Sequence, residues 1–273
     1  MFQKMLENVR GKCPLIHNIT NYVTVNDCAN IVLACGASPI MSDDQSEVEE
    51  ITTICGGLNI NIGTLNKRTI ESMLLAGKRA NALNHPAVLD PVGAGASRLR
   101  TDTANRLMQE VRFDAVRGNI SEIKTLCTGS GSTKGVDADA VDAVTEANLD
   151  DGVALVKAFA KQTGCIIAVT GAIDLVSDGA RCWCIRNGRA EMSRITGTGC
   201  QLSALMTAFL VANPDRKLDA AAAAVCMMGL AGEIGWANMQ PGDGNSTYRN
   251  RIIDAIFNMT GDALEEGAKY ELR

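Results

Sequence analysis

The chain has 273 residues, of which 46% are hydrophobic and 21% are charged, and this balance excludes disordered and collagen-like classes. A chain of this length can bury a large core in one or two domains. Its net charge of -5 at pH 7 argues against a nucleic-acid-binding protein, because phosphate backbones are bound by basic surfaces.

The ten cysteines include no C-x-x-C pair, and only His17 and His85 could add imidazole ligands, so a metal cage is not favoured. The first residues lack the apolar segment of a signal peptide, and free thiols are typical of a reducing compartment. We therefore expect a cytoplasmic protein.

The apolar run 220–232 is shorter than the 20 or so residues of a membrane span, and we predict a helix buried on all sides.

Short apolar runs alternate with helical patterns through the first two thirds of the chain. In chain order we predict strand 14–18, helix 23–35, strand 37–41, helix 46–55, strand 58–62, helix 67–83, strand 87–90, helix 102–111, strand 114–116, helix 121–127, helix 153–162 and strand 165–169. Gly36 is expected to end the first helix, and Ser46 and Asn119 are expected to cap later ones. This alternation predicts an α/β fold with a mainly parallel central sheet and helices on both faces.

The pattern changes near residue 174. Short runs at 174–177, 181–185 and 189–192 are separated by Asp178-Gly179 and Asn187-Gly188, which are hairpin signals. We expect these runs to form an antiparallel meander at one edge of the parallel sheet. Helices are predicted at 200–211, 218–238 and 247–268. Only 130–139 has the composition of a mobile loop, and the absence of a linker or repeat predicts a single domain over 1–273.

Open parallel sheets bind ligands beyond the carboxyl ends of their strands. The residues there are Asn18, Asn21, Met41, Ser42, Asp43, Asn61, Gly63, Asp90, Arg117, Asn119, Thr170 and Gly171.

The turn Thr196-Gly197-Thr198-Gly199-Cys200 runs directly into an apolar helix. Its glycines allow close approach of the backbone, and the free N–H groups of a helix start suit an anion. Gly197, Thr198 and Gly199 are therefore candidates for stabilising a transferring phosphoryl group, with Cys200 beside them. The alternative is an ordinary glycine-rich turn.

Three charged residues near the strand ends suit phosphate chemistry. Asp90 can bind magnesium through water or cap the following turn, and Arg117 offers a planar fork for phosphate. Glu122 lies three residues after Asn119, so it is expected to close a capping box, to organise a magnesium water, or both. No P-loop, Rossmann or G-x-S-x-G motif is present, and His17 is better explained by a structural role than a catalytic one.

Taken together, these segments resemble the hydroxyethylthiazole kinases, which have the ribokinase-like fold. The resemblance rests on an ordered series over nearly the whole chain: Pro14-Leu-Ile-His-Asn-Ile-Thr-Asn21, Gly36-Ala-Ser-Pro-Ile-Met41, Asn61-Ile-Gly-Thr-Leu65, Leu89-Asp-Pro-Val-Gly-Ala-Gly95, Arg117-Gly-Asn119, Lys134-Gly-Val-Asp137, Val169-Thr-Gly171 and Thr196-Gly-Thr-Gly-Cys200.

The resemblance implies that ATP phosphorylates the primary alcohol of 4-methyl-5-(2-hydroxyethyl)thiazole, with Mg2+, in thiamine biosynthesis or salvage. It also implies a homotrimer with active sites between subunits, and no nucleic-acid or membrane partner. Carried over by position, the thiazole contacts are Met41, Asn21, Val23 and Gly197; the ATP contacts are Arg117, Thr170, Asp90 and Gly171; and the magnesium-organising residues are Asp90 and Glu122. Met41 suits a thiazole, since a thioether packs well on aromatic rings, although a role as core filler is the alternative.

Cys200 takes the position where related ribokinase-like kinases carry an Asp base. A thiol is a poorer base than a carboxylate, so Cys200 is predicted to help the reaction without being essential. Three other functions fit the same fold: a hydroxymethylpyrimidine or pyridoxal-type kinase, an NAD(P)H-hydrate hydro-lyase, and a nucleotide-binding sensor without turnover. The first group usually carries Asp at this position, and retention of Asp90 and Glu122 argues against the sensor.

Overall fold

The computed structural model describes residues 1–128 and 143–273, so the loop expected at 130–139 lies outside the described residues. The described strands form one sheet of nine, in the order β2-β1-β3-β4-β5-β6-β7-β8-β9. Their bounds are β1 Leu15–Ile19, β2 Ser38–Met41, β3 Gly57–Asn61, β4 Ala87–Asp90, β5 Ala115–Asn119, β6 Ile166–Thr170, β7 Asp174–Ser177, β8 Cys182–Ile185 and β9 Tyr270–Leu272.

The strands from β2 to β6 are paired in parallel, and β7, β8 and β9 continue the sheet in antiparallel pairing. This confirms the predicted parallel sheet with an antiparallel meander at one edge. The register places the ends of neighbouring parallel strands side by side, pairing Asn18 with Met41, Asn61 with Asp90, and Asn119 with Thr170. The candidate residues therefore share one edge of the sheet.

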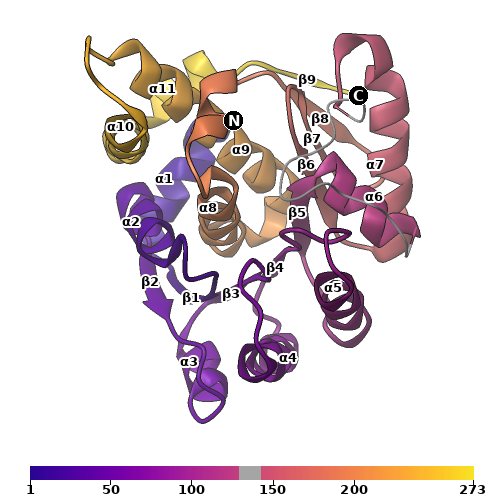
Figure 1. The fold of residues 1–273 in the computed structure, drawn as a ribbon. Helices are drawn as coiled ribbons and strands as arrows, with labels where there is room; N and C mark the ends of the chain where they lie inside the picture. Colours follow the sequence, from indigo (N-terminus) through magenta and orange to yellow (C-terminus); the bar gives the residue numbers. More distant parts are fainter. Residues whose placement is uncertain (129–142) are drawn as a thin grey trace.

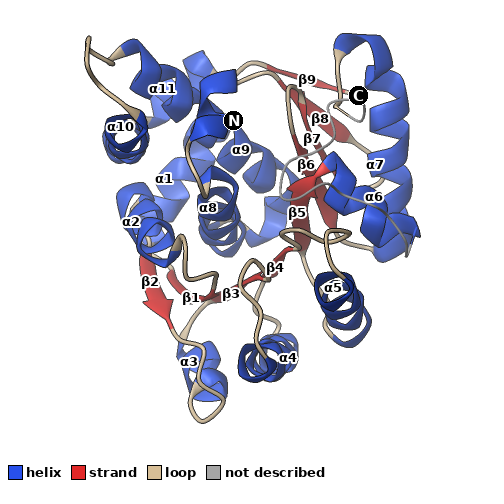
Figure 2. Cartoon of the chain, viewed as in Figure 1, coloured by secondary structure: helices blue, strands red, loops and turns tan. Residues whose placement is uncertain are grey.

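Helices cover both faces of the sheet, as expected (Figures 1 and 2). One face carries α3 (Val48–Ile54), α4 (Lys67–Leu83), α5 (Arg98–Glu110), α6 (Ile120–Thr128) and α7 (Leu149–Thr163). The other face carries α1 (Phe2–Lys12), α2 (Val25–Cys35), α8 (Thr198–Ala212), α9 (Lys217–Ala237), α10 (Asn245–Asn258) and α11 (Gly261–Gly267).

Helices α8 and α9 are apolar on all sides because they lie between the sheet and an outer layer formed by α1, α2 and α10. The run 220–232 is therefore a buried helix, as predicted. The segment Pro214–Ala237 is long and apolar enough to cross a membrane, but 78% of its apolar window is buried inside the fold. It is a core helix, because neighbouring helices and the sheet bury the apolar surface that lipid would cover in a membrane.

The third meander strand is not the predicted run 189–192, whose last three residues begin a 3-10 helix at Ala190–Arg194. Its place beside β8 is taken by β9 from the C-terminus, which no sequence signal indicated. Asn187 does not turn a hairpin, because its side chain is held by Gly267 O at 2.9 Å and by Lys269 N at 2.7 Å. The Asp178-Gly179 hairpin is confirmed between β7 and β8.

Some helix limits also differ from the prediction. The segment 247–268 is divided, because Met259 is extended and Thr260 caps a new helix, α11, by accepting from Ala263 N. Ser46 does not cap α3, since its hydroxyl donates to Asp44 Oδ1 at 2.7 Å and the helix begins two residues later. Gly36 ends α2 in the left-handed region, as expected. Helix α1 was not predicted, although Phe2, Met5, Leu6 and Val9 carry its apolar face at helical spacing.

Candidate active site

Asp90 ends the central strand β4 and is fully buried. Its Oδ2 accepts hydrogen bonds from Asn61 Nδ2 at 2.9 Å and from Ser203 Oγ at 2.8 Å, and Arg117 Nη1 lies 3.5 Å away. Its Oδ1 has no hydrogen-bond partner among the described residues. Burial raises the pKa of Asp90, and the positive charge of Arg117 partly offsets that rise.

Glu122 lies at the start of α6 and forms the capping box that its spacing predicted. Its Oε2 accepts from Asn119 N, and its own N–H donates to Asn119 Oδ1, both at 2.8 Å. Its Oε1 accepts from Gly93 N at 2.7 Å, so the same carboxyl holds the loop that follows Asp90. Burial, with the charge of Asp90 adding to it, raises the pKa of Glu122 to about 7.

Arg117 lies on β5 between the ends of β4 and β6. Its Nη2 donates to Thr170 Oγ1 at 2.6 Å, which joins two of the predicted ATP-binding residues. The guanidinium also lies directly against Gly199, where a Cβ atom would overlap its nitrogens. Gly171 follows Thr170, but its N–H is used within the turn, donating to Asp174 Oδ1 at 2.8 Å.

The turn before α8 has the geometry that an anion site needs. Gly197 has φ 85°, and a Cβ atom there would overlap the methyl group of Thr24. In the part of the chain that the structure describes, no side chain caps the start of α8. The N–H groups of Thr198, Gly199 and Cys200 are therefore left without intrahelical acceptors, at the positive end of the helix dipole.

Cys200 lies in the first turn of α8 and is only 8% exposed. Its Sγ accepts a hydrogen bond from Asn21 Nδ2 at 3.1 Å. Burial raises the pKa of the Cys200 thiol, and the charge of Asp90 raises it further, while Arg117 acts in the opposite direction. The free protein therefore holds Cys200 as a thiol at neutral pH.

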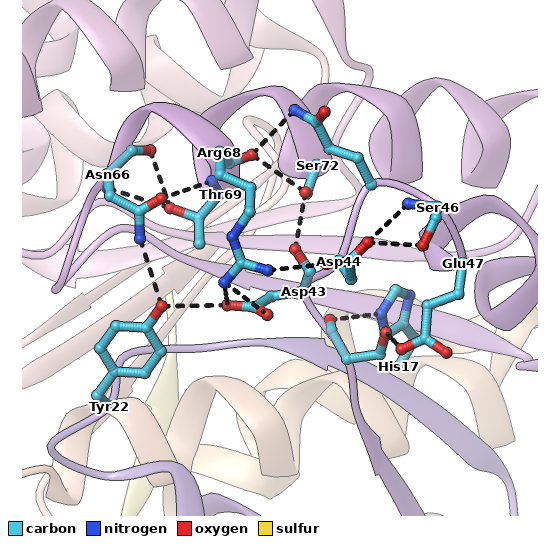
Figure 3. Close-up of polar contacts among 12 residues, drawn as sticks. His17, Tyr22, Asp43, Asp44, Ser46, Glu47, Asn66, Arg68, Thr69 and Ser72 are labelled. Atoms are coloured by element: carbon cyan, nitrogen blue, oxygen red, sulfur yellow. Dashed lines mark hydrogen bonds and ion pairs between the residues drawn. The ribbon is translucent and has the colours of Figure 1, made fainter.

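Three of the four predicted thiazole contacts belong to the β1–β2 side of this edge, and Asn21 among them reaches Cys200 of α8. Met41 ends β2 and is half-buried, Asn21 is buried, and Val23 is 64% exposed. Figure 3 shows that polar side chains tie the loops after β1, β2 and β3 together there. The Tyr22 hydroxyl donates to Asp43 and accepts from Asn66, each at 3.3 Å, and Arg68 pairs with Asp43 and Asp44.

His17 lies below this loop cluster and has the structural role that the sequence favoured (Figure 3). The ring is buried, with Nδ1 2.9 Å from Thr52 Oγ1 and Nε2 3.0 Å from Ser42 O. Burial lowers its pKa.

Three polar residues to which the sequence reasoning gave no role join the parts of this site, and of these only Asn61 was noted, as a residue at a strand end. Asn61 connects Asp90 with Asn21, and Ser203 connects Asp90 with α8. Thr24 contacts both Asn21 and Gly197. Ser203 had a signal, since it lies three residues after Cys200 in a mainly apolar helix and so shares its face. Within residues 1–128 and 143–273, no group of three or more metal-ligating side chains is found.

A mainly parallel sheet covered on both faces, with a helix start, an arginine and a buried carboxylate meeting at its carboxyl edge, is the arrangement of a protein with the ribokinase-like fold. Pyridoxal kinase from Staphylococcus aureus, in complex with ADP, superposes with a TM-score of 0.62 at 15% identity, covering 95% of this chain and 97% of that one. At that identity the likeness shows the fold alone. The chain belongs to the hydroxyethylthiazole kinase family, which it matches over residues 6–262.

Relatives named hydroxyethylthiazole kinase cover the whole chain. The protein of Clostridium acetobutylicum is 60% identical over 99% of both chains, and that of Clostridium beijerinckii is 50% identical over 98% of this chain and 95% of its own. The structure of the Pyrococcus horikoshii OT3 hydroxyethylthiazole kinase protein superposes with a TM-score of 0.88 at 33% identity, covering 100% and 98%. Membership in this family favours a thiazole kinase over a pyrimidine or pyridoxal kinase, a hydro-lyase or a sensor, and it implies ATP as co-substrate.

Proposed function

We propose that this protein transfers the terminal phosphoryl group of ATP to the primary alcohol of 4-methyl-5-(2-hydroxyethyl)thiazole, in thiamine biosynthesis or salvage. The observation that carries this proposal is the meeting of the uncapped start of α8 with Arg117 and Asp90 at one edge of the sheet. Phosphoryl transfer depends mainly on positioning and on stabilising negative charge, and these groups supply both.

Arg117, Thr170 and Gly171 would bind ATP. The Arg117 guanidinium can offer a planar fork to phosphate oxygens, and its bond to Thr170 fixes its direction. The backbone N–H groups from Gly197 to Cys200 would face the transferred phosphoryl group, where their fixed direction avoids reorganisation during the reaction.

Asp90 and Glu122 fit a magnesium ion. The buried Oδ1 of Asp90 has no hydrogen-bond partner within residues 1–128 and 143–273 and can act as a ligand, whereas both oxygens of Glu122 already accept backbone N–H groups. Asp90 would therefore contact the ion and Glu122 would orient one of its waters, which suits a metal that keeps several waters and binds one or two carboxylates plus phosphates. When bound, magnesium neutralises phosphate charge.

Met41, Asn21, Val23 and Gly197 would surround the thiazole at the β1–β2 end. The Met41 thioether is suited to a flat, soft ring. Val23 and its neighbour Tyr22 are 64% and 56% exposed in the single chain. Such exposure next to a site suits a homotrimer in which a neighbouring subunit completes the pocket. We also propose a cytoplasmic location, which agrees with ten free cysteines.

The test is release of ADP from magnesium-ATP with hydroxyethylthiazole, compared with hydroxymethylpyrimidine and pyridoxal at equal concentrations. We expect release with the thiazole alcohol and little with the other two. Asp90→Asn is the matched control, because it keeps the shape of the side chain and removes its charge. It should lower turnover at least 100-fold, which corresponds to a loss of about 3 kcal/mol of charge stabilisation in the transition state. Absence of thiazole-dependent release by the unmodified protein would contradict the proposal.

A further inference from the structure

Four buried side chains form one continuous series of hydrogen bonds from the β4 carboxylate to the α8 thiol. Asn61 Nδ2 donates to Asp90 Oδ2 at 2.9 Å, Asn21 Nδ2 donates to Asn61 Oδ1 at 3.0 Å, and Asn21 Nδ2 also donates to Cys200 Sγ at 3.1 Å. Asn61 is 1% exposed and Asn21 is 4% exposed, so water does not compete for these bonds.

The direction of each amide in this series is set by a backbone N–H, which can only donate. Gly63 N donates to Asn61 Oδ1 at 2.9 Å, so the Asn61 amino group must face Asp90. Thr24 N donates to Asn21 Oδ1 at 3.1 Å, so the Asn21 amino group must face Asn61 and Cys200. An exchange of oxygen and nitrogen in either amide would place donor against donor.

Asn21 has no hydrogen-bonding capacity left for a substrate. Its oxygen accepts from Thr24 N and Thr24 Oγ1, and its two N–H groups are used by Asn61 and Cys200. An amide side chain offers two lone pairs and two N–H groups, and all four are occupied. Asn21 can touch a ligand only by van der Waals contact. Its polar atoms therefore act on the reaction through Cys200.

We infer that Asn61 is a positioning residue: it holds the Asn21 amino group on the Cys200 sulfur and so couples the orientation of the thiol to Asp90. The inference rests on the proposed kinase activity. The sulfur of Cys200 accepts an N–H, which orients the thiol and favours its charged form over an unpartnered one. Without Asn61, the Asn21 amide keeps its two bonds from Thr24 but loses one of the two acceptors of its amino group, so the amino group is held less firmly on the Cys200 sulfur.

The experiment is a double-mutant cycle on kcat, in which Asn61→Ala is made in the unmodified protein and in Cys200→Ala. We expect a loss of about tenfold in the first background, which corresponds to about 1.4 kcal/mol, and less than about twofold in the second. The KM for ATP should change less than about twofold, because Arg117 and Thr170 are untouched and Asp90 keeps its bond from Ser203. Equal losses in both backgrounds would overturn the inference, since Asn61 would then act independently of Cys200.

Asn59→Ala is the matched control, because Asn59 lies on the same strand, is fully buried, and donates one side-chain bond, to Asn18 Oδ1 at 3.1 Å. It should leave kcat within about twofold.

If Asn61→Ala does not fold, Asn61→Ser replaces it in the same cycle. If Cys200→Ala turns over too slowly, a second cycle pairs the Asn61 variant with Asn21→Ala. There the double variant should lose no more than either single one, and additive losses would overturn the inference. An unmodified protein without thiazole kinase activity would instead refute the proposed function.

Discussion

Cys200 and Glu122 are two site residues whose protonation depends on their buried surroundings. Cys200 is held as a thiol by burial and by the charge of Asp90. Glu122 has a pKa of about 7 because its buried carboxyl lies near the same charge. Neighbouring groups shift the pKa of each of these acidic side chains, and single substitutions can separate the contribution of each neighbour.

Replacement of Cys200 tests whether the thiol is needed for turnover. Cys200→Ala should lower kcat by about 10- to 100-fold with ATP binding intact, which is less than the roughly 10²- to 10⁴-fold that an efficient general base contributes, because a thiol is a poor proton acceptor. Cys200→Asp should remain active, because a carboxylate accepts an alcohol proton more readily than a thiol does. Steady-state ADP release measures both variants. Complete loss of turnover in Cys200→Ala with binding retained, or a folded but inactive Cys200→Asp, would contradict this role.

Glu122 should make the stability of the ligand-free protein fall as pH rises. Its folded pKa of about 7 lies above the ordinary 4.5, so between pH 4.5 and 7 the folded state keeps a proton that the unfolded state has lost. The free energy of unfolding should decrease across this window, by at most on the order of 3 kcal/mol from this group.

Urea unfolding at several pH values measures this dependence. Glu122→Gln should flatten the profile between pH 4.5 and 7, while Asp174, whose pKa is also raised to about 7, should keep part of the slope. An unchanged slope in Glu122→Gln would show that Glu122 titrates normally in the folded state.

At the scale of elements, the start of α8 lies against β5 because residue 199 has no side chain. The guanidinium of Arg117 fills the space that a Cβ atom would need. Gly199→Ala should therefore displace Arg117 from Thr170 and raise the KM for ATP about tenfold or more, with a smaller effect on the KM for thiazole. Steady-state kinetics with each substrate varied in turn would measure the difference.

Gly11→Ala is the control for this substitution, because Gly11 is helical and no atom outside its own helix lies within 4 Å of a Cβ atom built there. It should leave the kinetics unchanged and slightly raise stability, since alanine favours a helix more than glycine does. If Gly199→Ala and Gly11→Ala have the same kinetics, Arg117 can shift without loss of ATP binding, and the prediction is wrong.

At the scale of the whole molecule, the exposed apolar side chains Tyr22, Val23, Leu33 and Phe257 indicate surface that another subunit could cover. A homotrimer should have about three times the chain mass of 28.9 kDa in light scattering after size exclusion. Val23→Asp should weaken thiazole binding whether or not it weakens assembly, because the residue lies next to the site. A protein that is monomeric and fully active would contradict sites between subunits.

The order of layers could be predicted because periodicity is a local property of the chain. Strands such as 87–90 and helices such as 67–83 were found within a residue or two, since apolar spacing and end residues determine them. The third meander strand could not be found in this way. β9 pairs with β8 from the far end of the chain, and its three residues have no pattern of their own apart from that pairing.

Local sequence patterns were enough to predict the parallel α/β architecture, the buried helices, the capping box of Glu122 and the turn from Gly197 to Cys200. Each depends on residues within a few positions of one another. The folded structure was needed to find that Asn61 joins Asp90 to Asn21, and that Asn21 uses its whole amide inside the protein. Those contacts join β3, β4, α8 and the loop after β1, and the direction of each bond depends on backbone N–H groups whose positions exist only in the folded chain.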